Sequence, residues 1–367
     1  MLPEGPGKLA ESHPIALCLL IITRNLCPPT DSCYARLQML KLGIYKKEQL
    51  RRDHLEGFFK SRKFIALDLY NALDEHPANE RDKIQERMLC RFSNKNGTFR
   101  YTHARRFDDF DRLAVKVIRY TFPPDKNIRV HDVAASDGRT SCDLYDSLDG
   151  VYGERLYFEA SDYAPFLYIV RKKGAASRLI TDHQDNILQI ITPPFVFNVV
   201  HSENKAFYPL NYLIRHLVTR FYARPMLRAC KSHRPGIERV RLELLCWECR
   251  EHIARKTNFR FERFDIFSRP THRFDVIRAM NVLNRSYFCD EDLKRVIENF
   301  IQSLNEGGLF ITGSNVEAGT VVNGGIYKKN AGRLERLEVS GEGSQVDGLI
   351  GDVYDINQPA IFGPSLT

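Results

Sequence analysis

The stretch Val130–Ser141, VHDVAASDGRTS, decides the fold of this chain. It begins as an apolar strand that ends in an acid, Asp132, and continues through small residues to Gly138, where a polar helix start follows. Small residues let a backbone come close to a ligand, and the amides at a helix start offer hydrogen-bond donors to an anion. The stretch therefore predicts the first strand–turn–helix unit of an α/β fold, with a ligand-binding turn.

The next apolar run, RLYFEASDYAP, also ends in an acid, Asp162. A turn of small residues with an acid further on is how a βαβ unit holds a nucleoside, because the acid accepts hydrogen bonds from the ribose hydroxyls. The dinucleotide fingerprint requires G-x-G-x-x-G, whereas this turn has A-x-S-x-G. The pattern favours a nucleoside without a pyrophosphate over NAD.

Composition indicates a globular protein rather than a membrane or disulfide-rich one. The 367 residues suit one large domain with insertions or two modest domains, and 43% of them are hydrophobic. The nine cysteines, an odd number at irregular spacings, favour a reducing compartment. The apolar run Ile15–Ile22 is too short to span a bilayer and lacks the flanks of a signal peptide. We therefore expect a cytoplasmic protein without a transmembrane segment.

The net charge of +8 comes from one part of the chain. Residues 201–263 hold 14 Lys and Arg against 6 Asp and Glu, and within them the segment 211–228 interleaves aromatic residues with arginines. One interpretation is a surface for an acidic partner, either RNA or an acidic lipid. The other, which we favour, is a helix that packs its aromatic side on the core and exposes its arginines to solvent.

Strand and helix patterns alternate from residue 125 onward. Their order predicts a Rossmann-like, doubly wound and mostly parallel α/β sheet with a C-terminal antiparallel hairpin around the turn KNAG. The domain boundaries that we expect are a poorly defined segment at 1–38, a helical N-terminal region at 39–124, the ligand-binding domain at 125–358 with an insertion at 171–236 after the second strand, and a tail at 359–367.

Three local expectations concern single elements of that domain. We expect a helical segment directly after the strand that ends near Asp162. We expect one continuous helix over 237–256, IERVRLELLCWECREHIARK, because its apolar residues recur at helical spacings. We also expect the turn NEGG, residues 305–308, to form a glycine C-cap after the helix that precedes it.

Taken together, these segments resemble the class I S-adenosylmethionine-dependent methyltransferases. VHDVAASDG stands where that family has its first glycine-rich motif, and FEASDYAP stands where it has its ribose-binding acid. FERFDIFSRP is similar to its third motif, in which an Asp after the strand lies near the adenine. Residues 274–313 correspond to the fourth strand through the glycine turn. The resemblance covers about residues 130–355, with four motifs in the expected order.

Within that class the pattern is nearest to the chemotaxis-receptor (CheR-type) methyltransferases, which methylate protein glutamates. Their first motif ends in Ser-x-Gly, as Ser136 and Gly138 do here. The chain departs from their pattern, since Ala134 replaces a glycine, Arg139 replaces an acid, and Met280 stands where they have an arginine. These departures leave the cofactor class in place and argue against a receptor as the substrate.

The resemblance implies a role for each matching residue. Asp132, Ala134, Ser136 and Gly138 would line the methionine end of S-adenosylmethionine, Asp162 would bind the ribose hydroxyls, Asp265 and Ile266 would flank the adenine, and Asn281 would face the transferred methyl group. No His or Glu is recognisable as a catalytic base, so none is assigned. The expected acceptor is a small molecule or a protein carboxylate. The alternatives are an RNA or other nucleic-acid methyltransferase and a non-catalytic binding protein with the same fold.

Four further residues have the spacing of zinc ligands, C-x2-H-x12-C-x2-C: Cys230, His233, Cys246 and Cys249. Two of them, Cys246 and Cys249, fall inside the helix predicted over 237–256, where thiols usually pack into the core. We favour core packing for these thiols and assign no metal.

Overall fold

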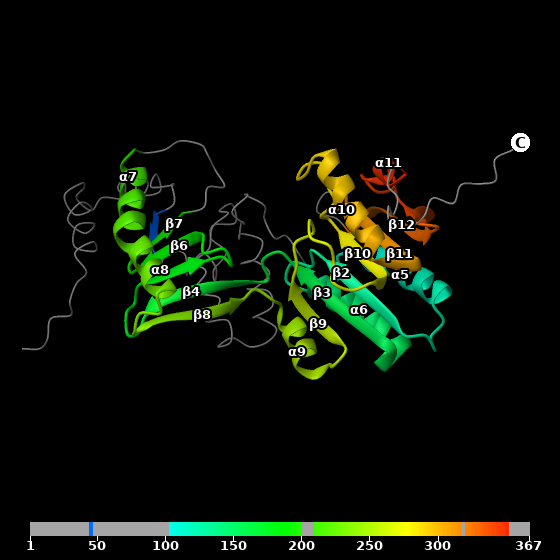
Figure 1. The fold of residues 1–367 in the computed structure, drawn as a ribbon, viewed down its shortest axis with the longest axis horizontal. Helices are drawn as coiled ribbons and strands as arrows, with labels where there is room; N and C mark the ends of the chain where they lie inside the picture. Colours follow the sequence, from blue (N-terminus) through cyan, green and yellow to red (C-terminus); the bar gives the residue numbers. More distant parts are fainter. Residues whose placement is uncertain (1–43, 47–102, 200–208, 317–319, 352–367) are drawn as a thin grey trace, which may run out of the picture. The chain divides into compact units, whose positions relative to one another are not determined.

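The computed structural model describes residues 44–46, 103–199, 209–316 and 320–351. The chain divides into two compact units, of which unit 1 comprises residues 1–100 and 166–242 and unit 2 comprises residues 101–165 and 243–367. Each unit has its own β-sheet (Figure 1). The segments predicted at 1–38 and 359–367, and most of the helical region predicted at 39–124, lie outside the described residues.

The sheet of unit 2 has seven strands in the order β13-β12-β11-β10-β2-β3-β9. The strands are β2 (Ile128–Val133), β3 (Leu156–Asp162), β9 (Phe259–Arg263), β10 (Phe274–Met280), β11 (Leu304–Asn315), β12 (Val322–Asn330) and β13 (Arg333–Ser340). Five neighbouring strands of this sheet are parallel to one another: β11, β10, β2, β3 and β9. The remaining two, β12 and β13, are antiparallel to their neighbours. This confirms the predicted mostly parallel, doubly wound sheet with a C-terminal hairpin.

The direction of winding reverses between two central strands of this sheet. From β2 the chain moves outward through β3 and β9 to one edge, whereas from β10 it moves through β11 to the other. The two central strands pair in parallel up to Val133 and Ala279. In open α/β sheets, ligands bind outside the carboxyl ends of the strands at such a switch point. The topology therefore directs attention to the loops that follow β2, β3, β9 and β10.

Helices cover both faces of the sheet of unit 2. They are α5 (Asp108–Thr121), α6 (Arg139–Tyr152), a 3-10 turn (Gly153–Arg155), α9 (Trp247–Arg255), α10 (Asp290–Ser303) and α11 (Asp347–Ile350). Neighbouring residues of a strand point to opposite faces. Val276 accordingly belongs to the core with α5 and α6, while Ile277 belongs to the core with α10. The apolar run of β10 is therefore buried on both sides.

Unit 1 is built on a six-stranded sheet in the order β1-β7-β6-β5-β4-β8. The strands are β1 (Ile44–Lys46), β4 (Phe166–Lys172), β5 (Arg178–Thr181), β6 (Ile187–Thr192), β7 (Phe195–Asn198) and β8 (Ile237–Glu243). Two helices, α7 (Pro209–Val218) and α8 (Arg224–Lys231), are joined by a π-helical turn (Thr219–Ala223). Val218, Ala223 and Met226 share a core with Leu179 and Phe197, so these helices pack on the sheet.

The helical segment predicted after Asp162 is wrong, because the strand β4 begins at Phe166. Pro165 disfavours the helical conformation for the residue before it. The sequence that follows, FLYIVRK, is rich in the aromatic and β-branched residues that favour strands. Two local preferences therefore outweigh the expectation of strand–helix alternation at this point.

Residues 237–256 form a strand and a helix, β8 and α9, instead of the single helix predicted. The reason lies in the neighbouring strand of the sheet. The guanidinium of Arg239 lies 3.8 Å from the ring centre of Tyr168, and that of Arg241 lies 4.1 Å from the ring centre of Phe166. The two partners on each strand are two positions apart, which matches the two-residue period of a β-strand. Cross-strand cation–π contacts of this kind stabilise the pairing of β8 with β4.

The predicted glycine C-cap at 305–308 is also wrong. Helix α10 ends at Ser303, and Leu304 is already extended and paired with Phe274. The register shifts between this pair and the next one, which identifies residues 305–308 as an irregular start of β11. Gly308 is required there because an added Cβ would lie 2.8 Å from the carbonyl oxygen of Asn305. The glycines thus serve a bulge and not a helix end.

Among the described residues, no helix combines the length and apolar character that are needed to cross a bilayer. The longest described helices have 14 residues and carry charged side chains, whereas a bilayer span needs about 20 mostly apolar residues.

Candidate functional site

The turn between β2 and α6 has the backbone of a glycine-rich loop at positions that are not all glycine. Ala134 and Ser136 each have a φ of 58°, and Gly138 has a φ of 84°. A residue with a side chain adopts this left-handed conformation at a cost of roughly 1–2 kcal/mol. Strained residues of this kind cluster at functional sites, where the surrounding structure holds them. All three small positions of A-x-S-x-G thus have the same unusual backbone conformation.

Asp162, at the end of β3, holds this turn in place. Its Oδ2 accepts a hydrogen bond from the backbone N–H of Ser136 at 2.9 Å, and its Oδ1 accepts one from the N–H of Ala164 at 3.0 Å. Its backbone carbonyl accepts a hydrogen bond from the N–H of Phe264 at 3.0 Å. The predicted ribose-binding acid therefore lies between the turn after β2 and the segment after β9.

The segment after β9 contains the two residues predicted to flank an adenine. Oδ1 of Asp265 accepts a hydrogen bond from the N–H of Phe267 at 3.0 Å, and its carbonyl accepts one from Ser268 at 2.8 Å. Ile266 is half-buried and packs against the core beside α10. Both predicted residues come directly after Phe264, the first residue beyond β9. The hydrogen bond from Phe264 to Asp162 therefore keeps them close to the predicted ribose-binding acid.

Asp132 is engaged inside unit 2. Its Oδ2 accepts hydrogen bonds from Oγ of Ser141 at 2.6 Å and from Nη1 of Arg278 at 2.9 Å. Nη2 of the same arginine donates to both carboxylate oxygens of Asp111, at 2.9 Å each. Burial raises the pKa of Asp111 to about 7 and also raises that of Asp132, although Arg278 lowers both. The buried network joins α5, β2, α6 and β10 directly beneath the turn.

Asn281 follows β10 and has a left-handed φ of 58°. Its Oδ1 accepts a hydrogen bond from the N–H of Asn315 at 2.9 Å, and its Nδ2 donates to Oδ1 of that residue at 3.0 Å. Its own N–H donates to the carbonyl of Gly313 at 2.8 Å. The side chain predicted to face the methyl group thus joins the ends of β10 and β11.

Helix α9 packs its first turn on the same loop. The N–H of Cys246 donates to the carbonyl of Asp137 at 2.8 Å, and Sγ of Cys246 accepts a hydrogen bond from the N–H of Cys249 at 3.3 Å. A Cβ added to Gly138 would lie 2.6 Å from Sγ of Cys249, so only glycine fits at this position. Both thiols are buried in the core.

The four residues with zinc-ligand spacing are divided between the units. Cys230 and His233 belong to unit 1, whereas Cys246 and Cys249 belong to unit 2. Among the described residues, the side chains close enough to share a metal ion do not include these four. The core-packing interpretation is confirmed for Cys246 and Cys249.

Sequence reasoning missed several residues that shape this region, namely Asp111, Ser141 and Asn315. One signal pointed to part of the network, because Arg278 stands inside a strand that is mostly apolar, FDVIRAM. A buried arginine requires carboxylate partners. Which acids fill that role depends on the tertiary structure, since Asp111 is 167 residues away along the chain.

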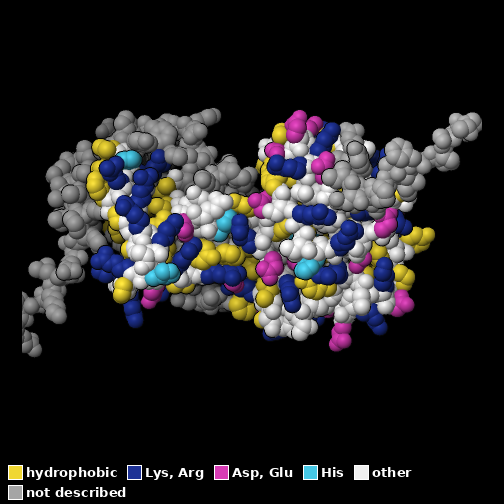
Figure 2. All heavy atoms as spheres, viewed as in Figure 1, with side chains coloured by type: hydrophobic (Ala, Val, Ile, Leu, Met, Phe, Trp, Pro, Cys, Tyr) yellow, Lys and Arg dark blue, Asp and Glu magenta, His cyan; other side chains and the backbone are white. Residues whose placement is uncertain are grey.

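The basic segment 201–263 presents exposed arginines on the α7–α8 region of unit 1 (Figure 2). Arg220, Arg224 and Arg228 are exposed there, as the favoured interpretation predicts, but Phe221 is also 64% exposed. Other cations of the segment have acidic partners within unit 1. Lys231 lies 3.0 Å and Arg239 2.9 Å from the carboxylate of Asp185. These pairs are typical of a solvated surface.

Known proteins give a limited comparison. No protein-family model matches the sequence, and no curated protein matches it either. Solved structures that align with it include the S-adenosylmethionine-bound amino pentose methyltransferase CalS10 from Micromonospora echinaspora, at 12% identity and a TM-score of 0.27 over 64% of this chain and 65% of that one. Another is magnesium protoporphyrin IX methyltransferase from Synechocystis, at 10% identity and a TM-score of 0.27 over 57% and 55%. A third is the [4+2]-cyclase SpnF, at 12% identity and a TM-score of 0.24 over 56% of this chain and 44% of that one.

This chain therefore spans less than two thirds of the length of each of these three proteins. All three TM-scores lie well below 0.5, so the similarities establish neither a family nor an activity. The fold class of unit 2 rests on its own strand order and pairing.

Proposed function

We propose that this chain is an S-adenosylmethionine-dependent methyltransferase, with the cofactor held at the carboxyl edge of the sheet in unit 2. The observation that carries the proposal is the left-handed turn of Ala134, Ser136 and Gly138, tied to Asp162 beside the switch point of the sheet. S-adenosylmethionine supplies a methyl group on a positively charged sulfur. Unit 2 would supply the binding site and the orientation.

The residues at this edge fit such a cofactor in shape and charge. The small side chains and left-handed backbone of Ala134 and Ser136 let main-chain atoms approach a ligand closely, while the missing side chain of Gly138 makes room for Cys249. Asp132 is buried and paired with Arg278, whereas the carboxylates of Asp162 and Asp265 end or follow two adjacent parallel strands. Their negative charge favours a cationic cofactor and opposes the pyrophosphate of a dinucleotide.

The roles of individual residues follow from this placement. We propose that Asp132, Ala134, Ser136 and Gly138 line the methionine end, that Asp162 binds the ribose hydroxyls, that Asp265 and Ile266 flank the adenine, and that Asn281 lies near the methyl group. Methyl transfer from a sulfonium is an in-line displacement, in which positioning alone can supply much of the acceleration. The network of Arg278 would fix the strand ends that carry these residues.

Calorimetry with S-adenosylhomocysteine tests the cofactor site. We expect the full chain to bind it, and we expect Asp162→Asn to weaken binding by about 10- to 100-fold, because a hydrogen bond to a charged group contributes about 1.5–3 kcal/mol. Asp182→Asn is a matched control, since Asp182 accepts the N–H groups of Gln184 and Asn186 in a similar turn of unit 1. Absence of binding by the unmodified chain, or equal affinity in both variants, would contradict the proposal.

The acceptor is proposed to be a small molecule or a protein carboxylate. Transfer of a labelled methyl group to the protein, small-molecule or RNA fraction of a cell extract separates these acceptors. No labelled product in any fraction, despite cofactor binding, would favour the non-catalytic alternative. A reducing, cytoplasmic location is proposed with it, because the five described cysteines are all free thiols.

A further inference from the structure

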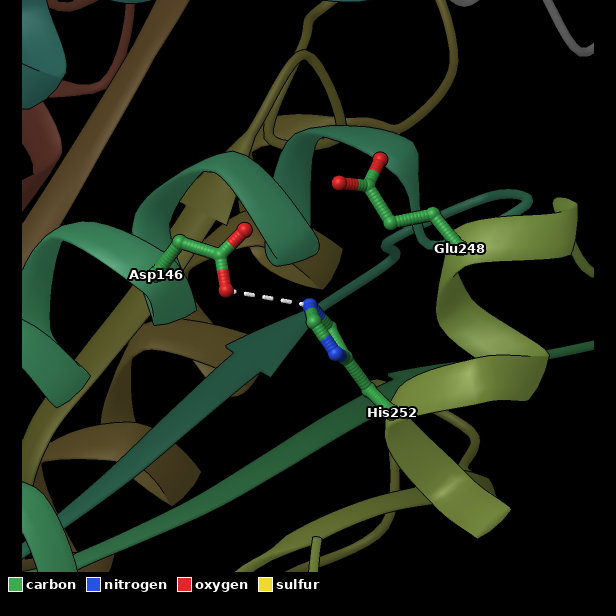
Figure 3. A group of neighbouring side chains, drawn as sticks. All are labelled: Asp146, Glu248 and His252. Atoms are coloured by element: carbon green, nitrogen blue, oxygen red, sulfur yellow. Dashed lines mark ion pairs between the residues drawn. The ribbon is translucent and has the colours of Figure 1, made fainter. Parts of the chain in front are cut away.

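A cluster of side chains outside the proposed cofactor site joins α6 to α9. Asp146 from α6 and Glu248 and His252 from α9 place one imidazole nitrogen and two carboxylate oxygens within 4.8 Å of one another. Figure 3 shows the three side chains converging on the space between the two helices. We propose that this cluster, Asp146–Glu248–His252, binds a divalent transition-metal ion, with Zn²⁺ as the best match.

The backbone presents these side chains in a geometry suited to a metal ion. Glu248 and His252 are four residues apart on α9, so they lie on one face of the helix. The same spacing places pairs of metal ligands on helices in zinc enzymes. Asp146 comes from α6, which packs against α9 within unit 2. Two rigid helices therefore supply all three ligands.

The imidazole of His252 is held by its aromatic neighbours. Its ring centre lies 5.1 Å from that of Tyr145 and 5.4 Å from that of Phe259. Its Nε2 is buried and lies 3.1 Å from Oδ1 of Asp146, with which it forms an ion pair when the imidazole is protonated (Figure 3). A nitrogen fixed in this way is preorganised to bind an ion shared with the carboxylate.

The charge of the cluster also favours a cation. Two carboxylates and a single imidazole have ligand atoms within 4.8 Å of one another, so the two negative charges repel each other. A bound cation would relieve this repulsion. One nitrogen and two oxygens suit Zn²⁺ better than Mg²⁺ or Ca²⁺, which prefer oxygen ligands alone. The exposed side of Asp146 and Glu248 leaves room for water to complete the coordination.

The ion would also hold α9 in its place on the proposed cofactor turn. The first turn of α9 bonds to Asp137 through Cys246 and contacts Gly138 through Cys249. Holding α9 against α6 would therefore also hold the residues that pack on Asp137 and Gly138. This consequence rests on the proposed function, whereas binding of the metal itself does not.

Titration of the chelator-treated full chain with ZnCl2, without any cofactor, tests the site. We expect one equivalent of Zn²⁺ to bind and to raise the Tm, and we expect MgCl2 to bind at least 10-fold more weakly. His252→Ala and Asp146→Asn should each weaken Zn²⁺ binding at least 10-fold. Glu251→Gln, on the same helix but paired with Arg255, should leave the affinity unchanged.

Circular dichroism identifies a variant that fails to fold. If His252→Ala fails to fold, Asp146→Asn still tests the site, because the side chain of Asp146 is exposed. The buried thiols of Cys246 and Cys249, in the first turn of α9, are the competing ligands for zinc. Equal Zn²⁺ affinity in the unmodified chain and in both cluster variants would assign the ion to those thiols and overturn the proposal. Absence of Zn²⁺ binding to the unmodified chain would overturn it as well.

Discussion

At the scale of single residues, the backbone of the turn after β2 is more informative than its side chains. Ala134 and Ser136 adopt a conformation that glycine adopts without strain. The turn thus has the geometry of a glycine-rich loop although its sequence is not glycine-rich. The structure around the turn, above all the carboxylate of Asp162, must therefore stabilise it.

Exchanging adjacent alanines for glycine tests this strain. Ala134→Gly should stabilise unit 2 by about 0.5 kcal/mol, because relief of the left-handed strain exceeds the entropic cost of glycine. Ala135→Gly should destabilise it by about 1–2 kcal/mol, since Ala135 is buried and its φ is not left-handed. Urea denaturation of both variants gives the comparison, and a loss of stability in both would show that the turn is not strained.

His131 is a buried residue with a measurable effect on pH stability. It is fully buried, its Nε2 lies 2.8 Å from Oγ of Ser161, and burial lowers its pKa to about 3. The unfolded chain therefore binds a proton below about pH 6.5 that the folded chain excludes. The contribution to stability is complete above this pH and is lost as the pH falls toward 3.

The variant His131→Asn isolates this effect. As the pH falls from 6 to 4, the free energy of unfolding should decrease in both proteins. The decrease per pH unit should be larger in the unmodified chain than in the variant by about 1.4 kcal/mol. Denaturation curves at several pH values measure the two slopes. Subtracting one slope from the other removes the contributions of all other acidic groups, and parallel slopes would contradict a buried neutral imidazole.

At the scale of secondary-structure elements, the network of Arg278 connects α5, α6, β2 and β10 in the interior of unit 2. Removing the guanidinium leaves the carboxylates of Asp111 and Asp132 buried without a counter-charge. We expect Arg278→Met to cost about 3–5 kcal/mol at pH 8. The cost should be smaller at pH 5, because buried carboxyl groups with raised pKa values take up protons as the pH falls.

Arg295→Met is the control for this experiment. Arg295 pairs with Asp292 at 3.1 Å, but both side chains are largely exposed. Exposed ion pairs contribute about 0–1 kcal/mol. Denaturation of both variants at pH 8 and pH 5 should therefore show a large, pH-dependent loss only for Arg278→Met. Equal losses would mean that burial of the network contributes nothing.

The elements also show where local sequence is enough. The hairpin of β12 and β13 matches its prediction, because a two-residue turn is a local signal. Ala331 and Gly332 both have positive φ values, as a tight hairpin turn requires. The segment that forms β8 lacked such a signal. Its conformation depends on Tyr168 and Phe166 of a neighbouring strand.

At the scale of the whole molecule, the two units have separate cores and sheets. A cofactor bound as proposed contacts unit 2, so it should stabilise local structure there. We expect S-adenosylhomocysteine to slow amide hydrogen exchange in the turn 134–138 and around Asp162 and Asp265. Exchange in β5, β6 and β7 of unit 1 serves as the internal control and should stay unchanged. Protection confined to those three strands would place the ligand elsewhere.

The sequence by itself determined the doubly wound sheet, its order of elements and the acids that follow its strands. These are local properties, since apolar periodicity and turn composition act over a few residues. Only the tertiary structure decided that Asp162 holds the turn, that Arg278 joins Asp111 to Asp132, and that Asp146 meets His252. Such pairings join residues far apart in the chain, and they form only when the burial of the core brings the elements together.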